Sequence, residues 1–176
     1  TNIKYTTKFG GAVGNFNAHI MALPHIDWVE FADKFIGKFG IERNQYTTQI
    51  DHYDNYSEIF DILRRINIIL IDMSRDMWSY ISRDYFKLRM TDDQVGSSAM
   101  PHKNNPIYFE KAEANLLLSN AIWNLFSNTL PISRMQRDLR DSSLLRNLGT
   151  GFSYMLISLN SIETGLNKLD INKNIL

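Results

Sequence analysis

The sequence predicts an all-α protein built as a bundle of long helices. Three stretches of roughly 25–30 residues carry apolar side chains at steps of three and four, which is the spacing of a helix face and not of a strand. Glycine and proline, which interrupt helices, are absent from residues 41–95. Since no two segments show the alternation of a strand pair, we expect no sheet.

A short helix is predicted first, over residues 28–39. Asp27 and Glu30 form an Asp-x-x-Glu capping box at its start, and Gly40 is placed as the stop at its end. Both signals are local, so they fix the position of this helix without any knowledge of its neighbours.

Three long helices follow, over residues 56–86, 106–130 and from 141 or 142 to 166. Pro106 suits the first position of the second helix because its missing N–H costs nothing there. Gly149 and Gly151 lie inside the third helix, where we expect them to allow close contact with another helix rather than to break it.

These helices exceed the mean of about 11–12 residues in globular proteins. Their apolar faces are too broad for three helices to cover one another. We therefore predict a bundle that is completed by other helices, through further sequence, oligomerisation or both.

Composition narrows the class of protein. The chain has 176 residues, with 19 Lys and Arg against 19 Asp and Glu, and this balance argues against a nucleic-acid or membrane-surface partner. Zero Cys excludes a disulfide scaffold, a Cys-ligated metal site and a thiol nucleophile. No apolar run approaches the ~20 residues of a membrane span. We expect a soluble, cytoplasmic protein, and the start at Thr1 without Met suggests a piece of a longer chain.

The segment over residues 96–106 carries the sharpest chemical signal. It reads Gly-Ser-Ser-Ala-Met-Pro-His-Lys-Asn-Asn-Pro and must be a loop between two helices. Its hydroxyls, backbone N–H groups, the Lys103 ammonium and the carboxamide before a helix start would favour an anion. A solvated linker is the competing interpretation.

Residues 134–146 form a second polar string, in which Ser142 and Arg146 are four apart and share a helix face. Together with Arg137 they would make a phosphate clamp, because a guanidinium fork matches phosphate oxygens. Surface ion pairs between the interleaved Arg and Asp residues are the alternative.

Other polar features carry weaker signals. The glycines of residues 10–14 do not match a dinucleotide fingerprint, and we expect them to serve packing between helices. The Tyr-Thr-Thr-Gln run that ends at Gln49 fits a helix-entry turn. None of the four His residues has a partner at metal-ligand spacing, so no metal site is predicted.

The loop resembles the signature Gly-Ser-Ser-x-Met-Pro-x-Lys-x-Asn-Pro of the fumarase/aspartase superfamily, helical homotetrameric lyases that eliminate fumarate. Three further runs resemble the adenylosuccinate lyase family: Gly-Ala-Val-Gly-Asn-Phe-Asn-Ala-His from Gly11, Tyr-Thr-Thr-Gln from Tyr46, and Arg-Asp-Leu-Arg-Asp-Ser-Ser-Leu-Leu-Arg-Asn-Leu-Gly from Arg137. The resemblance covers essentially the whole chain. It implies that residues 1–165 belong to the central helical domain and residues 166–176 begin a C-terminal domain.

The resemblance also implies roles for individual residues. Ser97 matches the general base. The substrate-binding set that it implies comprises Gln49, Ser98, Met100, Lys103, Asn105, Arg137, Ser142 and Arg146. The family's general acid is a His upstream of Thr1, so none of this chain's His residues is given that role. Lys111 departs from the Asn expected in the bacterial-type enzymes, so a contact there is in doubt.

The implied activity is β-elimination of fumarate from a succinyl-nucleotide, giving AMP from adenylosuccinate and AICAR from the succinylcarboxamide ribotide. The resemblance implies that no cofactor is needed. It also implies a homo-oligomer, expected to be a tetramer, in which the active sites are shared between subunits. Two alternatives stay open: another lyase of the superfamily such as argininosuccinate lyase, which shares the loop but should lack the phosphate clamp, and a helical structural module without activity.

Overall fold

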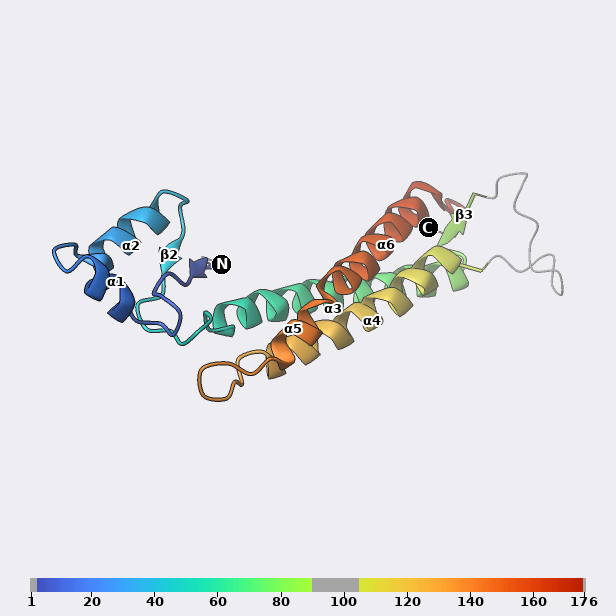
Figure 1. Cartoon of the computed structure of the whole chain (residues 1–176). Coiled ribbons are helices and arrows are strands. Elements are labelled where there is room, and N and C mark those ends of the chain that lie inside the picture. Colours follow the sequence, from blue (N-terminus) through green and yellow to red (C-terminus); the bar gives the residue numbers. More distant parts are fainter. Residues whose placement is uncertain (1–2, 90–104, 176) are drawn as a thin grey trace. The chain divides into compact units, whose positions relative to one another are not determined.

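A computed structural model of the chain describes residues 3–89 and 105–175, and these residues confirm the all-α prediction (Figure 1). The helices are α1 (Asn17–Ala22), α2 (Trp28–Gly37), α3 (Asp54–Ser82), α4 (Ile107–Thr129), α5 (Arg140–Leu145) and α6 (Leu148–Asn167). The chain divides into two compact units, residues 1–62 with 124–146 and residues 63–123 with 147–176.

Two small sheets correct the expectation that the chain forms none. In the first unit β1 (Thr6–Thr7) pairs in parallel with β2 (Glu42–Arg43). In the second unit β3 (Phe86–Leu88) pairs antiparallel with β4 (Leu169–Ile171). Both sheets have two strands of two or three residues, too short for an alternating pattern to be visible in the sequence.

The N-terminal cap of α2 is confirmed, and Gly40 lies in the turn after the helix. The Asp27 carboxylate accepts a hydrogen bond from the backbone N–H of Glu30 at 2.9 Å. Gly40 has φ +69°, a left-handed conformation that glycine adopts without the steric cost of a Cβ. The N-cap therefore lies where it was predicted, whereas α2 ends at Gly37 with Lys38 as its C-cap, short of the predicted end at residue 39.

The third predicted helix is wrong in one respect, because it is two helices. The chain leaves α5 at Arg146, and α6 begins at Leu148 after Asn147, whose ψ of 5° is not helical. The apolar spacing continues across this break, and so the periodicity could not reveal it.

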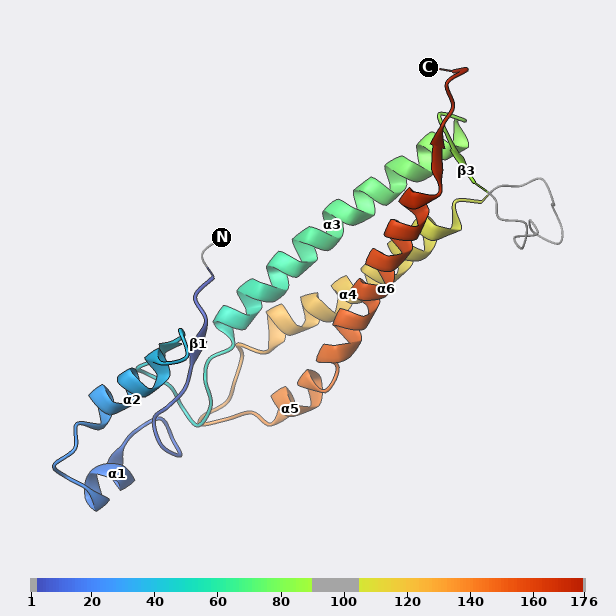
Figure 2. The same cartoon turned by 90° about the horizontal axis from the view of Figure 1, so that it is seen from above.

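The second unit is built around α3, α4 and α6, which run alongside one another (Figures 1 and 2). One apolar cluster joins Ile71 to Ala112, Leu116 and Ile162. A chain of buried hydrogen bonds also joins the three helices: the Asn67 amide of α3 donates to Ser119 Oγ of α4 at 3.1 Å, and Ser119 Oγ donates to the Gly151 carbonyl of α6 at 3.0 Å.

The two glycines at the start of α6, Gly149 and Gly151, behave differently. A Cβ on Gly151 would lie 2.6 Å from the Trp123 ring, so the expected close contact is confirmed there. A Cβ on Gly149 would meet nothing within 4 Å, and the expectation is wrong for that residue.

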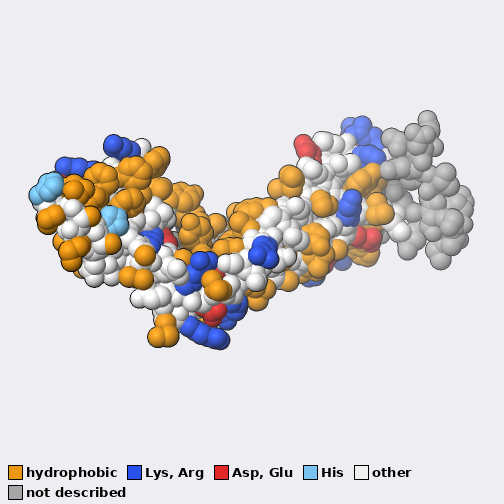
Figure 3. Space-filling model, in the orientation of Figure 1, with side chains coloured by type: hydrophobic (Ala, Val, Ile, Leu, Met, Phe, Trp, Pro, Cys, Tyr) orange, Lys and Arg blue, Asp and Glu red, His pale blue; other side chains and the backbone are white. Residues whose placement is uncertain are grey.

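Large apolar side chains stay exposed on the long helices, as the broad apolar stripes predict. Ile69 of α3 is 65 % exposed and Leu156 of α6 is 59 % exposed. Hydrophobic side chains also gather on the surface of the region that holds α1 and α2, at the left of Figure 3. The chain by itself does not cover these faces.

Candidate functional site

Two of the predicted substrate-binding segments meet in the first unit. The backbone N–H of Gln49 donates to the carbonyl of Gln136, the residue before Arg137, at 3.3 Å. The two segments are far apart in the sequence, and this bond places the Gln49 backbone beside the string that carries Arg137, Ser142 and Arg146.

Lys8 fixes the same segment from its other side. Its ammonium donates to the Gln49 carbonyl at 2.7 Å and also to the carbonyl of Gly11. One cation thus ties the glycine loop to the Tyr46–Gln49 run, and the two carbonyls that it binds are held by a charge-assisted contact.

The glycines near Gly11 are not packed between helices, which corrects the earlier expectation. Gly11 and Gly14 have φ +71° and +80°, and a Cβ on Gly14 would lie 1.9 Å from the Thr47 carbonyl oxygen. Gly14 therefore lets two backbone segments touch. The run that ends at Gln49 is likewise not a helix-entry turn, since α3 begins only at Asp54.

The Asp141 carboxylate organises the predicted phosphate site. Asp141 is 5 % exposed. Its Oδ2 accepts from the Tyr53 hydroxyl at 3.0 Å and from Arg137 Nε at 3.3 Å. Its Oδ1 accepts from the Ser142 N–H at 2.6 Å, from Ser142 Oγ at 3.2 Å and from Arg137 Nη2 at 3.3 Å. Arg137 Nη2 also donates to Ser142 Oγ at 2.9 Å, so three of these side chains form one closed cluster.

The environment of this cluster fixes its protonation states. Burial by itself would raise the pKa of Asp141, but hydrogen bonds from Arg137, Tyr53 and the Ser142 N–H outweigh burial and lower that pKa below its ordinary value. Burial, together with the hydrogen bond to the Asp141 carboxylate, raises the pKa of Tyr53 to about 12. At neutral pH the tyrosine is therefore a donor and the aspartate an anion.

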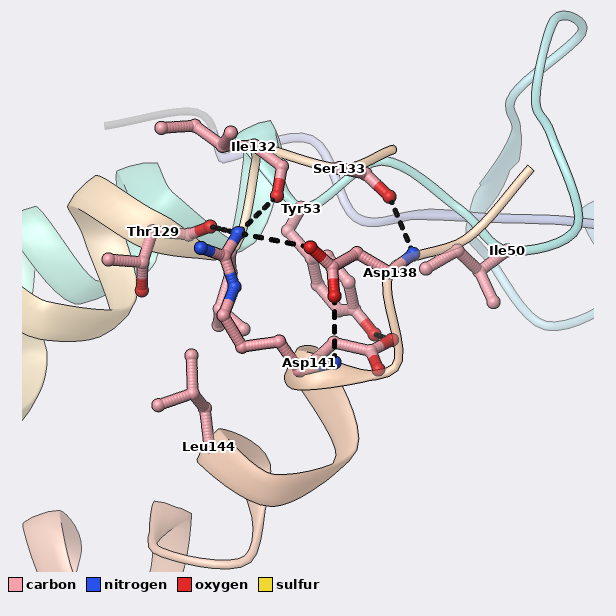
Figure 4. A pocket seen from close by; sticks show the side chains of 10 residues that line it. Ile50, Tyr53, Thr129, Ile132, Ser133, Asp138, Asp141 and Leu144 are labelled. Atoms are coloured by element: carbon pink, nitrogen blue, oxygen red, sulfur yellow. Dashed lines mark hydrogen bonds and ion pairs between the residues drawn. The ribbon is translucent and has the colours of Figure 1, made fainter. Parts of the chain in front are cut away.

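Figure 4 shows a pocket lined in part by Tyr53 and Asp141, with the Tyr53 hydroxyl beside Asp141 and the Asp138 backbone N–H beside Ser133 Oγ. Arg140 closes one side, donating to the Ile132 carbonyl at 2.7 Å and the Thr129 carbonyl at 3.3 Å. These contacts tie the first residue of α5 to the end of α4 and to the loop that follows it.

Ion pairs between Arg and Asp do occur in this string, as the alternative interpretation predicts. Arg134 pairs with Asp138 at 3.5 Å and Arg140 pairs with the same carboxylate at 3.8 Å. Arg137 pairs with Asp141 at 3.3 Å. Arg146 is different: it is exposed at the end of α5, and no hydrogen bond or ion pair to another described residue engages its guanidinium.

The remaining predicted site residues lie outside the described residues or in the second unit. Ser97, Ser98, Met100 and Lys103 lie outside the described residues. Asn105 belongs to the second unit, is exposed, and its carbonyl accepts from the Ile107 N–H at 2.8 Å just before α4. Lys111 is exposed on α4.

Sequence reasoning missed three residues of the site. Asp141 follows Arg137 by four, a spacing that could have flagged the pair. Tyr53 and Lys8 carried no local signal, because their partners are 88 and 41 residues away.

A family model described as "Lyase" matches residues 2–120, and the chain belongs to this lyase family. A second family model, "Adenylosuccinate lyase C-terminal", matches residues 133–176. The predicted domain boundary after residue 165 stays a prediction.

Curated relatives are similar over nearly the whole chain. It is 54 % identical to an adenylosuccinate lyase of Legionella pneumophila over 96 % of its length, and 50 % identical to those of Dictyostelium discoideum and Escherichia coli over 98 % and 95 %. The matched region is 37 % of each of these relatives, so the chain spans little more than a third of their length.

Among the described residues, no helix is long and apolar enough to cross a membrane. No group of three or more His, Asp or Glu side chains in that part of the chain could hold a metal ion.

Proposed function

We propose that this chain is part of an adenylosuccinate lyase. The enzyme eliminates fumarate from adenylosuccinate to give AMP, and from succinylaminoimidazolecarboxamide ribotide to give AICAR. Membership in the lyase family and about 50 % identity to three adenylosuccinate lyases support this function.

One structural observation carries the proposal. The family resemblance implies that the Gln49 and Arg137 segments both bind substrate, and they are joined by the hydrogen bond from the Gln49 N–H to the Gln136 carbonyl. A site that must hold both ends of one substrate needs its binding segments side by side, whereas a merely structural helical module has no such need.

In the proposed reaction Ser97 removes the proton from the succinyl carbon next to a carboxylate. The electron pair left on that carbon forms the double bond of fumarate as the carbon–nitrogen bond breaks, and a His outside this chain protonates the departing nitrogen. A serine can act as base only if its alkoxide is stabilised by nearby donors and charge. Lys103 and Asn105 would stabilise the negative charge that develops on the substrate, with Ser98 and Met100 shaping the loop.

Arg137, Ser142 and Arg146 would hold the nucleotide phosphate. Arg146 supports this role because its guanidinium is exposed and engages no other described residue. Charge-assisted hydrogen bonds of this kind contribute about 1.5–3 kcal/mol each. The Arg146→Ala variant should therefore raise the KM for adenylosuccinate about 10–100-fold.

Arg134→Ala is the matched control, since Arg134 lies in the same string, is 81 % exposed and pairs with Asp138. Its KM should stay within about twofold of the unchanged protein. Equal effects of the two substitutions would count against the phosphate clamp.

We further propose that the protein is a homo-oligomer, a tetramer with active sites shared between subunits. The exposed apolar side chains of α3 and α6, such as Ile69 and Leu156, support a need for covering helices. Light scattering of the full-length protein tests the oligomeric state, and a monomer at micromolar concentration would refute it.

The central test is the Ser97→Ala variant of the full-length protein, assayed by fumarate release. The rate should fall by about 10²–10⁴-fold or more, while adenylosuccinate still binds. Ser153→Ala, which alters an exposed hydroxyl that donates to the Gly149 carbonyl, should leave the rate unchanged. Near-normal turnover by Ser97→Ala would overturn the assignment, and fumarate release from argininosuccinate instead would identify the alternative lyase.

A further inference from the structure

Asp141 is saturated with donors. Its two oxygens accept five hydrogen bonds, of which four come from Arg137 and Ser142, its close neighbours in the sequence. A buried carboxylate in this state has little capacity left for a ligand. Its role is to hold other side chains in place.

The fifth donor is Tyr53, which comes from a distant segment. Its hydroxyl donates to Asp141 Oδ2 at 3.0 Å across 88 residues of sequence. The Tyr53 carbonyl accepts from the Ser57 N–H at 2.8 Å in the first turn of α3, so the tyrosine is anchored to a 29-residue helix. Of the described side chains that donate to Asp141, Tyr53 alone lies outside the Arg137–Ser142 segment.

Arg137 and Ser142, the two donors next to Asp141, belong to the proposed phosphate site. Arg137 donates through Nε and Nη2, and no hydrogen bond within the described residues engages its Nη1. The side chain is 28 % exposed, so part of the guanidinium is open to solvent. Ser142 Oγ accepts from Arg137, and its orientation therefore follows that of the guanidinium.

We propose that Tyr53 is a positioning residue for the phosphate of the nucleotide, because its hydroxyl locks Asp141 and through Asp141 fixes Arg137 and Ser142. This inference rests on the proposed adenylosuccinate lyase function. It assigns Tyr53 no part in the elimination chemistry at Ser97.

The physical reason is the geometry of the carboxylate. With the tyrosine bound, Asp141 is held between two segments and cannot turn with the short α5 loop. Without it, Oδ2 keeps only the 3.3 Å contact with Arg137, and every donor left to the carboxylate belongs to the Arg137–Ser142 segment itself. Arg137 then loses the orientation needed for bidentate contact with phosphate oxygens.

The test is the Tyr53→Phe variant of the full-length protein, which removes only the hydroxyl. We expect the KM for adenylosuccinate to rise about tenfold while kcat stays within about twofold, since the lost interaction is with a non-reacting part of the substrate. Tyr56→Phe is the matched control, because Tyr56 lies one helical turn away with its ring 5.9 Å from that of Tyr53 and no hydrogen bond of its hydroxyl within the described residues.

Inhibition by two small anions separates positioning from general damage to the fold. The inhibition constant of inorganic phosphate should rise about tenfold in Tyr53→Phe, whereas that of fumarate should not change. Asp141→Asn, which keeps the volume and removes the charge, is the second variant and should raise the phosphate constant as well.

Three results would overturn the inference. They are an unchanged phosphate constant in Tyr53→Phe, an equal rise for phosphate and fumarate, and an effect of Tyr56→Phe as large as that of Tyr53→Phe. If the unchanged protein releases no fumarate from adenylosuccinate, the proposed function is wrong, and the role of Tyr53 that rests on it is wrong too. If the unchanged protein is active but Tyr53→Phe has no effect, only the role of Tyr53 is wrong.

Discussion

Replacing Gly151 by alanine tests the closest helix contact in the second unit. The added Cβ would lie 2.6, 2.8 and 2.9 Å from three carbons of the Trp123 ring, well inside van der Waals contact. Trp123 is fully buried, and the Gly151 carbonyl accepts a hydrogen bond from Ser119. Neither the ring nor the backbone can move aside without losing packing or that bond.

The size of the effect follows from two opposing contributions. Forcing an extra methyl group into a packed core costs about 1–3 kcal/mol. Alanine in place of glycine favours a helix by up to about 1 kcal/mol. We therefore expect Gly151→Ala to lower the free energy of unfolding by about 1–2 kcal/mol.

Gly149→Ala is the internal reference, since Gly149 lies two residues earlier in α6 and a Cβ there meets nothing within 4 Å. Because both substitutions gain helix propensity, the difference in unfolding free energy between the two variants isolates the Trp123 contact, at roughly 1–3 kcal/mol. Urea unfolding of the full-length protein measures this difference.

Equal stabilities of the two variants, or a more stable Gly151→Ala, would refute the reasoning. A double-mutant cycle with Trp123→Phe gives an independent check. The smaller ring should reduce the cost of Gly151→Ala, because the two residues are in contact and their effects are not additive.

Three further predictions concern the first unit, each measured by unfolding. Asp27→Ala should cost about 1 kcal/mol through loss of the α2 cap, and no loss would show that the 2.9 Å bond is not stabilising. Gly40→Ala should cost about 1–2 kcal/mol for its positive φ alone. Gly14→Ala should destabilise well beyond that, because of these two glycines only Gly14 has a carbonyl oxygen where the Cβ would lie; equal costs would contradict this. Folding lowers the pKa of Asp141, so its carboxylate adds to the free energy of unfolding above the ordinary pKa of 3.8, and this stabilisation is lost as the pH falls below that value. Asp141→Asn should therefore weaken the dependence of the unfolding free energy on pH at the acid end. An unchanged pH dependence would count against this.

Much of the architecture was readable from local patterns. The long helices and the α2 caps follow from side-chain spacing and from Asp27 and Gly40, all of which act within one or two turns. The polar string over residues 134–146 also stood out, because its Arg and Ser residues have a composition that a core does not require.

The features that the sequence did not predict depend on residues far away in the chain. Gly149 and Gly151 look alike in the sequence, and only the position of Trp123 makes one of them a packing residue and the other neutral. The break between α5 and α6 was invisible, since the apolar spacing runs through it.

The sequence by itself determined the helical class, while its resemblance to a known family implied the role of the loop over residues 96–106 and the two segments predicted to bind substrate. Only the tertiary structure decided that Lys8 ties down Gln49 and that Tyr53 secures Asp141. The physical reason is that helix periodicity and capping are set by neighbours a few residues away. A hydrogen bond across 88 residues depends instead on the path of the whole chain.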